Sequence, residues 1–265
     1  MTSSPASADG FGALRLSSAS LSNLEQLGYT RMTPIQAASL PISLAGQDLI
    51  AQASTGSGKT AAFGLPLVER LDGAGLPGGS VQAVVLCPTR ELADQVTQDI
   101  RRLARARPNV KVLTLCGGVA LRGQVQSLEH GADVVVGTPG RILDLLQRGS
   151  LSLAAVHTLV LDEADRMLDM GFFDDITQVL GQCAKDRQTL LFSATYPEGI
   201  GKLAAQFMRS PQTVKVEALH SAHKIRQIFV EVSETERLHA VSMLLAHYRP
   251  ERTLAFCNTK QQCRD

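Results

Sequence analysis

The chain has 265 residues, of which 44% are hydrophobic and 19% are charged, and its formal net charge is +1 at pH 7. This composition is typical of a globular protein with a core, and no apolar run approaches the roughly 20 residues that cross a bilayer. The near-zero charge excludes a strongly basic chain, so any nucleic-acid site must be a local patch that also uses backbone amides and helix N-termini. Residues 1–10 are small and polar and lack the features of a signal peptide, so we expect a disordered leader.

The cysteines and histidines show no metal-binding or redox pattern. The six histidines form no H-E-x-x-H group. The cysteines are scattered, odd in number and without a C-x-x-C pair; they are Cys87, Cys116, Cys183, Cys257 and Cys263. We therefore expect a reduced, cytoplasmic protein without a zinc site.

Short apolar runs alternate with helical patterns along residues 11–217. Most of the runs are continuous, which is typical of strands buried on both faces of a sheet. Strands are predicted at residues 48–51, 81–87, 110–115, 134–137, 158–161, 189–192 and 213–216. Helices are predicted at residues 35–44, 60–71, 91–105, 142–147, 173–183 and 199–208. The alternation predicts an α/β domain with a mostly parallel sheet and helices on both faces.

A second alternation begins after a predicted linker at residues 218–226. It comprises a predicted strand at residues 228–232, a helix at 236–247, a strand at 253–257 and a helix that opens at Lys260. Two strands are too few to bury a core. We therefore expect residues 227–265 to be the truncated start of a second domain.

The glycine-rich segment ASTGSGKT, between the first predicted strand and its helix, carries the strongest chemical signal. It matches the phosphate-binding loop G-x-x-x-x-G-K-[ST], except that Ala53 replaces the first glycine. Glycines let backbone N–H groups turn toward phosphates, the lysine supplies positive charge, and the final hydroxyl suits Mg²⁺. The alternative is a chance glycine-rich turn, but the order of strand, loop and helix favours a phosphate site. The candidate residues are Ala53, Ser54, Thr55, Gly56, Ser57, Gly58, Lys59 and Thr60.

Acidic residues follow directly after the predicted strand at 158–161. The sequence there is Asp162-Glu163-Ala164-Asp165, and the carboxyl ends of parallel strands are where such sheets bind ligands. Asp162 suits Mg²⁺ coordination, in part through water, and Glu163 suits the polarisation of an attacking water. An acidic cluster alone is usually a solvated helix start. The phosphate loop in the same chain favours the functional interpretation.

These two segments together resemble the DEAD-box family of RNA helicases. The stretch GYTRMTPIQ, which ends at Gln36, resembles the family's Q motif, and Phe11 resembles its upstream aromatic residue. The resemblance implies a RecA-like fold that uses ATP and Mg²⁺, with Gln36 on the adenine edge and Phe11 stacked on the base. Taken alone, Gln36 could be a surface helix residue and Phe11 a core residue.

Turns after three other predicted strands resemble the family's RNA-backbone motifs. Such turns offer N–H groups, hydroxyls and arginines, which hold phosphates without reading sequence. Each is weak alone, and Arg90 could instead be a structural ion-pair partner; their expected position at one sheet edge favours RNA. The candidate RNA-binding residues are Pro88, Thr89, Arg90, Gly117, Gly118, Thr138, Pro139, Gly140 and Arg141.

Two further patterns concern hydroxyl and arginine side chains. Ser193 and Thr195 match the family's coupling motif and could hydrogen-bond to the acidic segment, although a helix cap before Pro197 is an alternative. A cluster of arginines suggests an RNA patch, but a solvated helix end is the preferred interpretation. The cluster is Arg101, Arg102, Arg105 and Arg107.

The resemblance implies a monomeric, RNA-stimulated ATPase that separates short RNA duplexes. Residues 113–118, 166–172 and 256–259 resemble the bacterial DbpA-type branch, which implies ribosomal RNA as partner and a role in ribosome assembly. The family's arginine-bearing motif on the second domain is missing before Asp265, so we expect the chain alone to bind nucleotide weakly and hydrolyse it slowly. The alternatives are an ATP-dependent RNA clamp without useful hydrolysis and a phosphate-loop small-molecule kinase.

Overall fold

The computed structural model describes residues 10–72, 80–216, 226, 228–257, 259 and 261–264. The chain divides into two compact units, Met1–Ala218 and Leu219–Asp265, and each is described by itself. Residues 1–9 of the predicted leader and nearly all of the predicted linker lie outside the described residues, as does Lys260. In the described part of the chain, no helix is both long and apolar enough to cross a membrane.

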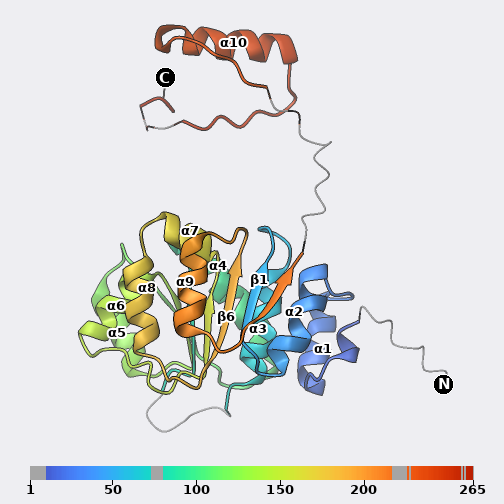
Figure 1. Ribbon diagram of the computed structural model, residues 1–265, viewed down its shortest axis with the longest axis vertical. Coiled ribbons are helices and arrows are strands. Elements are labelled where there is room, and N and C mark those ends of the chain that lie inside the picture. The colour runs from blue at the N-terminus through green and yellow to red at the C-terminus, as the bar shows by residue number, and fades with distance from the viewer. Residues whose placement is uncertain are drawn as a thin grey trace, which may run out of the picture. The chain divides into compact units, whose positions relative to one another are not determined.

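The first unit contains one seven-stranded sheet in which every neighbouring pair of strands is parallel (Figure 1). The strand order is β3-β4-β2-β5-β6-β1-β7. All seven predicted strands are present, although β2 and β3 are shorter than predicted and β6 is longer. Their bounds are β1 Leu49–Gln52, β2 Ala83–Leu86, β3 Val112–Leu115, β4 Val134–Gly137, β5 Thr158–Leu161, β6 Gln188–Ser193 and β7 Gln212–Lys215.

Helices cover both faces of this sheet, as the alternating pattern predicts. One face packs against α1 (Ser18–Gln26), α2 (Pro34–Leu44), α3 (Lys59–Glu69) and α4 (Arg90–Leu103), which bury residues such as Phe63 and Ile100. The other packs against α5 (Leu121–Glu129), α6 (Pro139–Gln147), α7 (Ala164–Asp169), α8 (Phe173–Gly181) and α9 (Glu198–Phe207). Short 3-10 turns lie at Phe11–Ala13 and Ala104–Ala106.

The sequence pattern missed three of these helices, each for a local reason. The sequence of α1, SASLSNLEQ, has few apolar residues, and the helix begins because the Ser17 side chain accepts a hydrogen bond from the N–H of Ser20. Helix α5 carries Gly123 in its interior and buries only Gln124. Helix α7 has six residues, too few for a periodic pattern.

Because all strands run the same way, their carboxyl ends share one edge of the sheet. Adjacent strands β1, β6 and β5 lead into the phosphate-loop segment, the Ser193–Thr195 turn and the acidic segment, respectively. Adjacent strands β2, β4 and β3 lead into the three turns predicted to bind RNA. The topology therefore gathers the two sets of candidate residues on neighbouring halves of a single edge.

The second unit confirms its predicted helix but not its predicted strands. Helix α10 spans Arg237–Tyr248, one residue later than predicted, after a 3-10 turn at Glu234–Glu236. The predictions of strands at residues 228–232 and 253–257 were wrong, because the described residues of this unit contain no paired strand. A strand persists only beside a hydrogen-bonded neighbour. Apolar side chains here are accordingly exposed, including Phe229 and Phe256, each 91% exposed.

Candidate functional site

The phosphate-loop segment connects β1 to α3. The N–H of Ala53 donates to the Ser193 carbonyl at 3.0 Å, which continues the β1–β6 pairing, so this position has no need of the glycine that the motif prescribes. Gly56 and Gly58 have φ angles of +79° and +92°, in the left-handed region that favours glycine. Because α3 begins at Lys59, its unpaired first-turn N–H groups lie at this loop, as anion binding requires.

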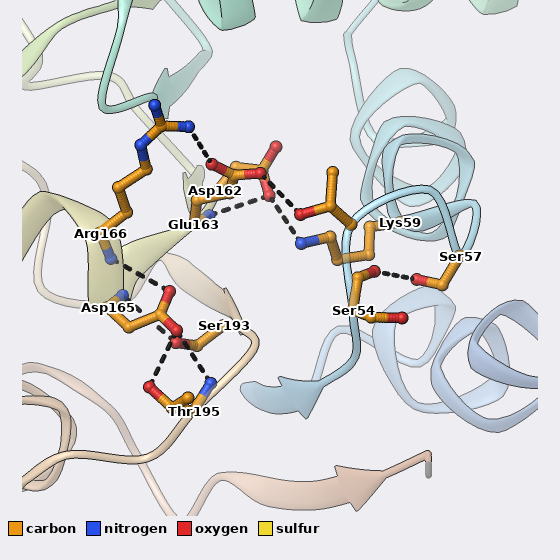
Figure 2. A network of polar contacts seen from close by, with 10 residues as sticks. Ser54, Ser57, Lys59, Asp162, Glu163, Asp165, Arg166, Ser193 and Thr195 are labelled. Atoms are coloured by element: carbon orange, nitrogen blue, oxygen red, sulfur yellow. Dashed lines mark hydrogen bonds and ion pairs between the residues drawn. The ribbon is translucent and has the colours of Figure 1, made fainter. Parts of the chain in front are cut away.

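Lys59 and Asp162 converge on the same point from different elements (Figure 2). The Lys59 Nζ lies 3.9 Å from the Asp162 Oδ1, within ion-pair range but too far for a hydrogen bond. Lys59 is only 7% exposed, and its Nζ has no hydrogen-bond partner in the described part of the chain. A buried ammonium group with three unused donors fits the oxygens of a phosphate.

The two acidic residues at the end of β5 have different environments. Asp162 is 3% exposed, and burial raises the pKa of its carboxyl to about 6, although the Lys59 charge opposes the shift. Glu163 has a φ angle of 50°, a conformation that costs a non-glycine residue about 1–3 kcal/mol. Its Oε1 accepts a hydrogen bond of 3.1 Å from the Thr55 hydroxyl, and its Oε2 lies 3.2 Å from a guanidinium nitrogen of Arg166. The Glu163 carboxylate is therefore held from two sides (Figure 2).

Hydrogen bonds join the acidic segment to the turn after β6, on Asp165 rather than on Asp162. The backbone N–H and the hydroxyl of Thr195 each donate to the Asp165 Oδ2 at 2.9 Å, and the N–H of Asp165 donates to the Ser193 hydroxyl at 3.2 Å (Figure 2). Partial burial acts to raise the pKa of Asp165, but the hydrogen bonds from Thr195 and Ser193 outweigh it and hold that pKa below its ordinary value. The turn after β6 is therefore hydrogen-bonded to the Asp165 carboxylate and stabilises its charged form.

A cavity of about 420 Å³ is lined by Lys59, Asp162 and Glu163. Gln36 also lines it, with its Oε1 accepting from the N–H of Thr33 at 2.9 Å and its Nε2 donating to the Gly58 carbonyl at 3.0 Å. The first bond belongs to a capping box that starts α2. Gln36 therefore joins the start of α2 directly to the phosphate loop.

The aromatic residue that lines this cavity is Tyr29, not the predicted Phe11. Tyr29 lines the cavity, whereas Phe11 is only 5% exposed and is not among the lining residues. The Phe11 ring instead packs edge-on against the Tyr29 ring, with centroids 6.0 Å apart. Sequence reasoning gave no role to several lining residues, although Tyr29 and Arg31 lie within the Q-like stretch and the others share one stripe of α4. These residues are Tyr29, Arg31, Leu92, Gln95 and Asp99.

The oxygen donors of the site fit a hard divalent cation such as Mg²⁺. Asp162 and Thr60 both line the cavity. Within the described residues, no group of three or more histidine, cysteine or acidic side chains could hold a metal. A cation here would therefore need phosphate oxygens and water as its remaining ligands, which is how Mg²⁺ usually binds beside nucleotides.

The turns after β2, β3 and β4 also lie together. The Arg90 guanidinium contacts the Cα side of Gly118, and it forms no ion pair in the described part of the chain. The Arg141 guanidinium donates to the Val119 carbonyl at 3.4 Å through both terminal nitrogens. Two arginines from two helices thus reach one short loop, and the alternative of a structural ion pair for Arg90 is unsupported.

The remaining residues of these turns shape the starts of two helices. The Thr89 hydroxyl accepts a hydrogen bond from the N–H of Leu92 at 3.3 Å and caps α4. Thr138 is the residue before α6, and its carbonyl accepts from the N–H of Arg141 at 3.1 Å. Pro88 and Pro139 are buried, while Gly117 and Gly140 are at least partly exposed. The exposed backbone at this edge is available to a ligand.

The arginine cluster at the end of α4 is partly structural. Arg101 donates to the Val112 carbonyl through two nitrogens, at 3.2 and 2.6 Å. Arg107 donates to the carbonyls of Val68 and Leu71 at 2.5 and 2.6 Å. These two side chains donate hydrogen bonds to backbone carbonyls of neighbouring elements. This structural role does not support an RNA patch at this position.

A parallel sheet with a phosphate loop after β1, an acidic pair after β5 and a hydroxyl-bearing turn after β6 defines a RecA-like phosphate-loop domain. Residues 33–203 match the family model of the DEAD/DEAH box helicases. The chain therefore belongs to this family.

Relatives and solved structures agree with the family. The chain is 51% identical to the ATP-dependent RNA helicase DbpA of Escherichia coli over 245 residues, which are 92% of this chain and 53% of that protein. It is 44% identical to the DEAD-box ATP-dependent RNA helicase CshA of Geobacillus kaustophilus over 253 residues, 95% of this chain and 53% of that protein. The crystal structure of a DEAD box protein from Methanococcus jannaschii matches with a TM-score of 0.75 and 39% identity, covering 97% of this chain and 68% of that one. The chain spans about half the length of the curated relatives it matches.

Proposed function

We propose that this chain binds ATP and RNA as the nucleotide-binding domain of an ATP-dependent RNA helicase. The observation that carries the proposal is the convergence of the Lys59 ammonium and the Asp162 carboxylate in one cavity, 3.9 Å apart, with the Lys59 donors unused. Stability is a poor explanation for two buried opposite charges without a hydrogen bond between them, because each charged group loses its hydration on burial. A magnesium–triphosphate placed there would satisfy both.

Within this proposal, the phosphate loop holds the triphosphate. The N–H groups of Gly56, Gly58, Lys59 and Thr60 and the Lys59 ammonium would face its oxygens, while the Thr60 hydroxyl and Asp162, partly through water, would hold Mg²⁺. When bound, Mg²⁺ supplies positive charge that offsets the charge developing on the phosphates. Ser54 and Ser57 support the loop, since the Ser57 hydroxyl donates to the Ser54 carbonyl at 2.8 Å.

The adenine would lie at the Gln36 end of the cavity. After its bonds to Thr33 and Gly58, the Gln36 amide retains one N–H and one lone pair, which match the donor and acceptor of the adenine edge. The stacking of Phe11 on the base stays a prediction. Tyr29 is the aromatic residue that lines the cavity in the present structure, and Phe11 supports its ring.

Glu163 is the residue we assign to the attacking water. Hydrogen bonds from Thr55 and Arg166 fix the orientation of its carboxylate. A general base must be held in position in this way. The bonds of Ser193 and Thr195 to Asp165 would couple this acidic segment to the turn after β6. Hydrolysis and conformational change would thereby be linked.

RNA would lie across the turns after β2, β4 and β3, held by its sugar-phosphate backbone. The support is the pair of guanidinium groups, from Arg90 and Arg141, on the loop that contains Gly118. Ribose 2′-hydroxyl contacts would give the preference for RNA. We further propose ribosomal RNA as the partner and ribosome assembly as the pathway, supported by the DbpA-type motifs and by 51% identity to the relative of that name. A monomeric state and a cytoplasmic location remain part of this proposal.

We also propose that the 265-residue chain alone hydrolyses ATP slowly. Among the described residues, the one arginine that lines the cavity is Arg31, which belongs to the Q-like stretch. Arginines that stabilise a transferring phosphoryl group are worth roughly 10³–10⁵ in turnover. Strong RNA-stimulated turnover by this chain would contradict the proposal.

The test compares wild type with Glu163→Gln in single-turnover hydrolysis of radiolabelled ATP, with the chain in excess and with or without RNA. We expect unchanged nucleotide affinity and a hydrolysis rate lower by roughly 10²–10⁴, the usual contribution of general acid–base catalysis. The exposed Asp169 is the last residue of α7, the helix that Glu163 immediately precedes, and Asp169→Asn is the matched control, with wild-type rates expected. Equal rates for wild type and Glu163→Gln would favour the RNA clamp, and a chain that binds ATP but no RNA would favour the kinase alternative.

A further inference from the structure

Gln124 is a buried polar residue that belongs to no motif and lies next to the turns proposed to bind RNA. It lies on α5 and is only 8% exposed. Its Nε2 donates a hydrogen bond of 2.9 Å to the carbonyl of Cys116, the residue directly before Gly117 and Gly118. Its Oε1 is buried without a hydrogen-bond partner in the described part of the chain.

The loop that Gln124 contacts is held from three helices. Arg90, at the start of α4, packs against Gly118, and Arg141, on α6, donates to the Val119 carbonyl. Gln124 holds the residue where this loop leaves β3. The loop has few side-chain contacts of its own, because two of its residues are glycines, so its position depends on these neighbours.

Stability does not account for an amide at this position. A buried acceptor without a partner costs the full loss of its hydration, which can match or exceed the net gain from the one hydrogen bond that Gln124 makes. An apolar side chain of the same length would avoid that cost. A buried amide that carries such a cost points to a role in the neighbouring site.

We propose that Gln124 is a positioning residue for RNA binding: through the Cys116 carbonyl it fixes the Gly117–Gly118 turn where Arg90 and Arg141 can grip the RNA backbone together. The inference rests on the proposed RNA binding by this edge. Gln124 itself touches no RNA in this account, because its side chain is buried beneath the loop.

The test uses Gln124→Met, which keeps the length of the side chain and removes both its hydrogen bond and its unpaired oxygen. Gln124→Leu is the second variant, in case the first does not fold. Gln126 is exposed on the same helix, so Gln126→Met makes the same chemical change away from the loop. For each chain, three quantities are measured: the Tm, the Kd for a fluorescein-labelled single-stranded decauridylate at fixed salt, and the Kd for a fluorescent ATP analogue.

We expect Gln124→Met to raise the RNA Kd about tenfold, with an unchanged nucleotide Kd and a Tm equal to or above that of wild type. Gln126→Met should match wild type in all three. An RNA Kd equal to that of wild type would overturn the inference, as would a Tm that falls along with RNA affinity, because that result assigns Gln124 a purely structural role. If the wild-type chain binds no decauridylate, the proposed function itself fails and the inference falls with it.

Discussion

The Lys59 ammonium lies 3.9 Å from a carboxylate oxygen of Asp162, although the strands that precede these residues, β1 and β5, are not neighbours. Strand β6 lies between them, and the phosphate loop and the acidic segment meet beyond its end. Both side chains are buried, so each carries a desolvation cost that their separation does not fully repay. This arrangement is what the proposed magnesium–triphosphate site requires.

Replacing Asp162 should stabilise the free protein at neutral and alkaline pH. The folded pKa is raised to about 6 from 3.8, so the folded chain binds the proton more tightly than the unfolded chain does. Stability from this group is therefore present below pH 3.8 and lost as pH rises through about 6. Asp162→Asn, which stays neutral, should exceed wild type in free energy of unfolding by on the order of 1–3 kcal/mol at pH 8.

Urea unfolding of both proteins between pH 4 and pH 8, without nucleotide, measures this difference. The gap should shrink toward pH 4, where the wild-type carboxyl is itself protonated. A gap that is constant with pH, or an Asn variant that is less stable at pH 8, would argue against a buried carboxylate whose pKa is raised by burial.

The two left-handed glycines of the phosphate loop should differ in their tolerance of alanine. A Cβ on Gly56 would meet nothing within 4 Å, so Gly56→Ala carries only the backbone cost of about 1–2 kcal/mol. A Cβ on Gly58 would lie 2.7 Å from the Gln36 Nε2 and 3.1 Å from the Thr33 hydroxyl. Gly58→Ala should add about 1 kcal/mol by displacing the Gln36 amide from its bond to the Gly58 carbonyl.

Thermal or urea unfolding of the two alanine variants gives the comparison, with each serving as the control for the other. We expect nucleotide affinity to fall further in Gly58→Ala, because its loop loses the contact with Gln36. Equal effects on stability and nucleotide binding would show that the Gln36 link contributes nothing.

Removal of the Thr195 hydroxyl should weaken the hold on Asp165. Thr195→Val deletes one of the two hydrogen bonds to the Asp165 Oδ2 and keeps the backbone one, so we expect a loss of about 0.5–1.5 kcal/mol at pH 7. The pKa of Asp165 is lowered from 3.8, so its contribution is present above that pH and lost as pH falls through the folded pKa. The loss in the variant should therefore diminish in acid.

Thr195→Ser restores a hydroxyl and is the matched control. The Asp165 carboxyl pKa, followed by NMR, should rise in Thr195→Val and return in Thr195→Ser. An unchanged pKa in Thr195→Val would mean that the hydroxyl does not stabilise the charged carboxylate.

The sequence predicted the sheet well because continuous apolar runs are a strong signal for strands buried on both faces. The helix predictions failed where the periodic signal was weak: α5 has Gly123 in its interior, and α7 directly follows Glu163, whose left-handed conformation no periodicity reveals. The strands predicted at residues 228–232 and 253–257 had suitable composition, but strand formation also depends on a paired neighbour.

The residues of the candidate site were predictable where a motif fixes their types, as at Lys59 and Asp162. Lining residues without a motif were missed, because their role depends on how helices pack. Asp99 and Gln95 reach the cavity only because α4 presents one of its polar stripes there. Gln124 was missed for the same reason, since its contact with Cys116 joins two elements whose packing the sequence does not specify.

The most direct test of the central claim is the affinity of the chain for a fluorescent ATP analogue, measured with Mg²⁺ and with EDTA, for wild type, Lys59→Ala and Asp162→Asn. If both side chains serve one magnesium–triphosphate, Mg²⁺ should tighten binding to wild type, Asp162→Asn should lose that effect, and Lys59→Ala should bind more weakly under both conditions. If Asp162→Asn keeps the full Mg²⁺ effect, or if Lys59→Ala binds as tightly as wild type, the shared site does not exist.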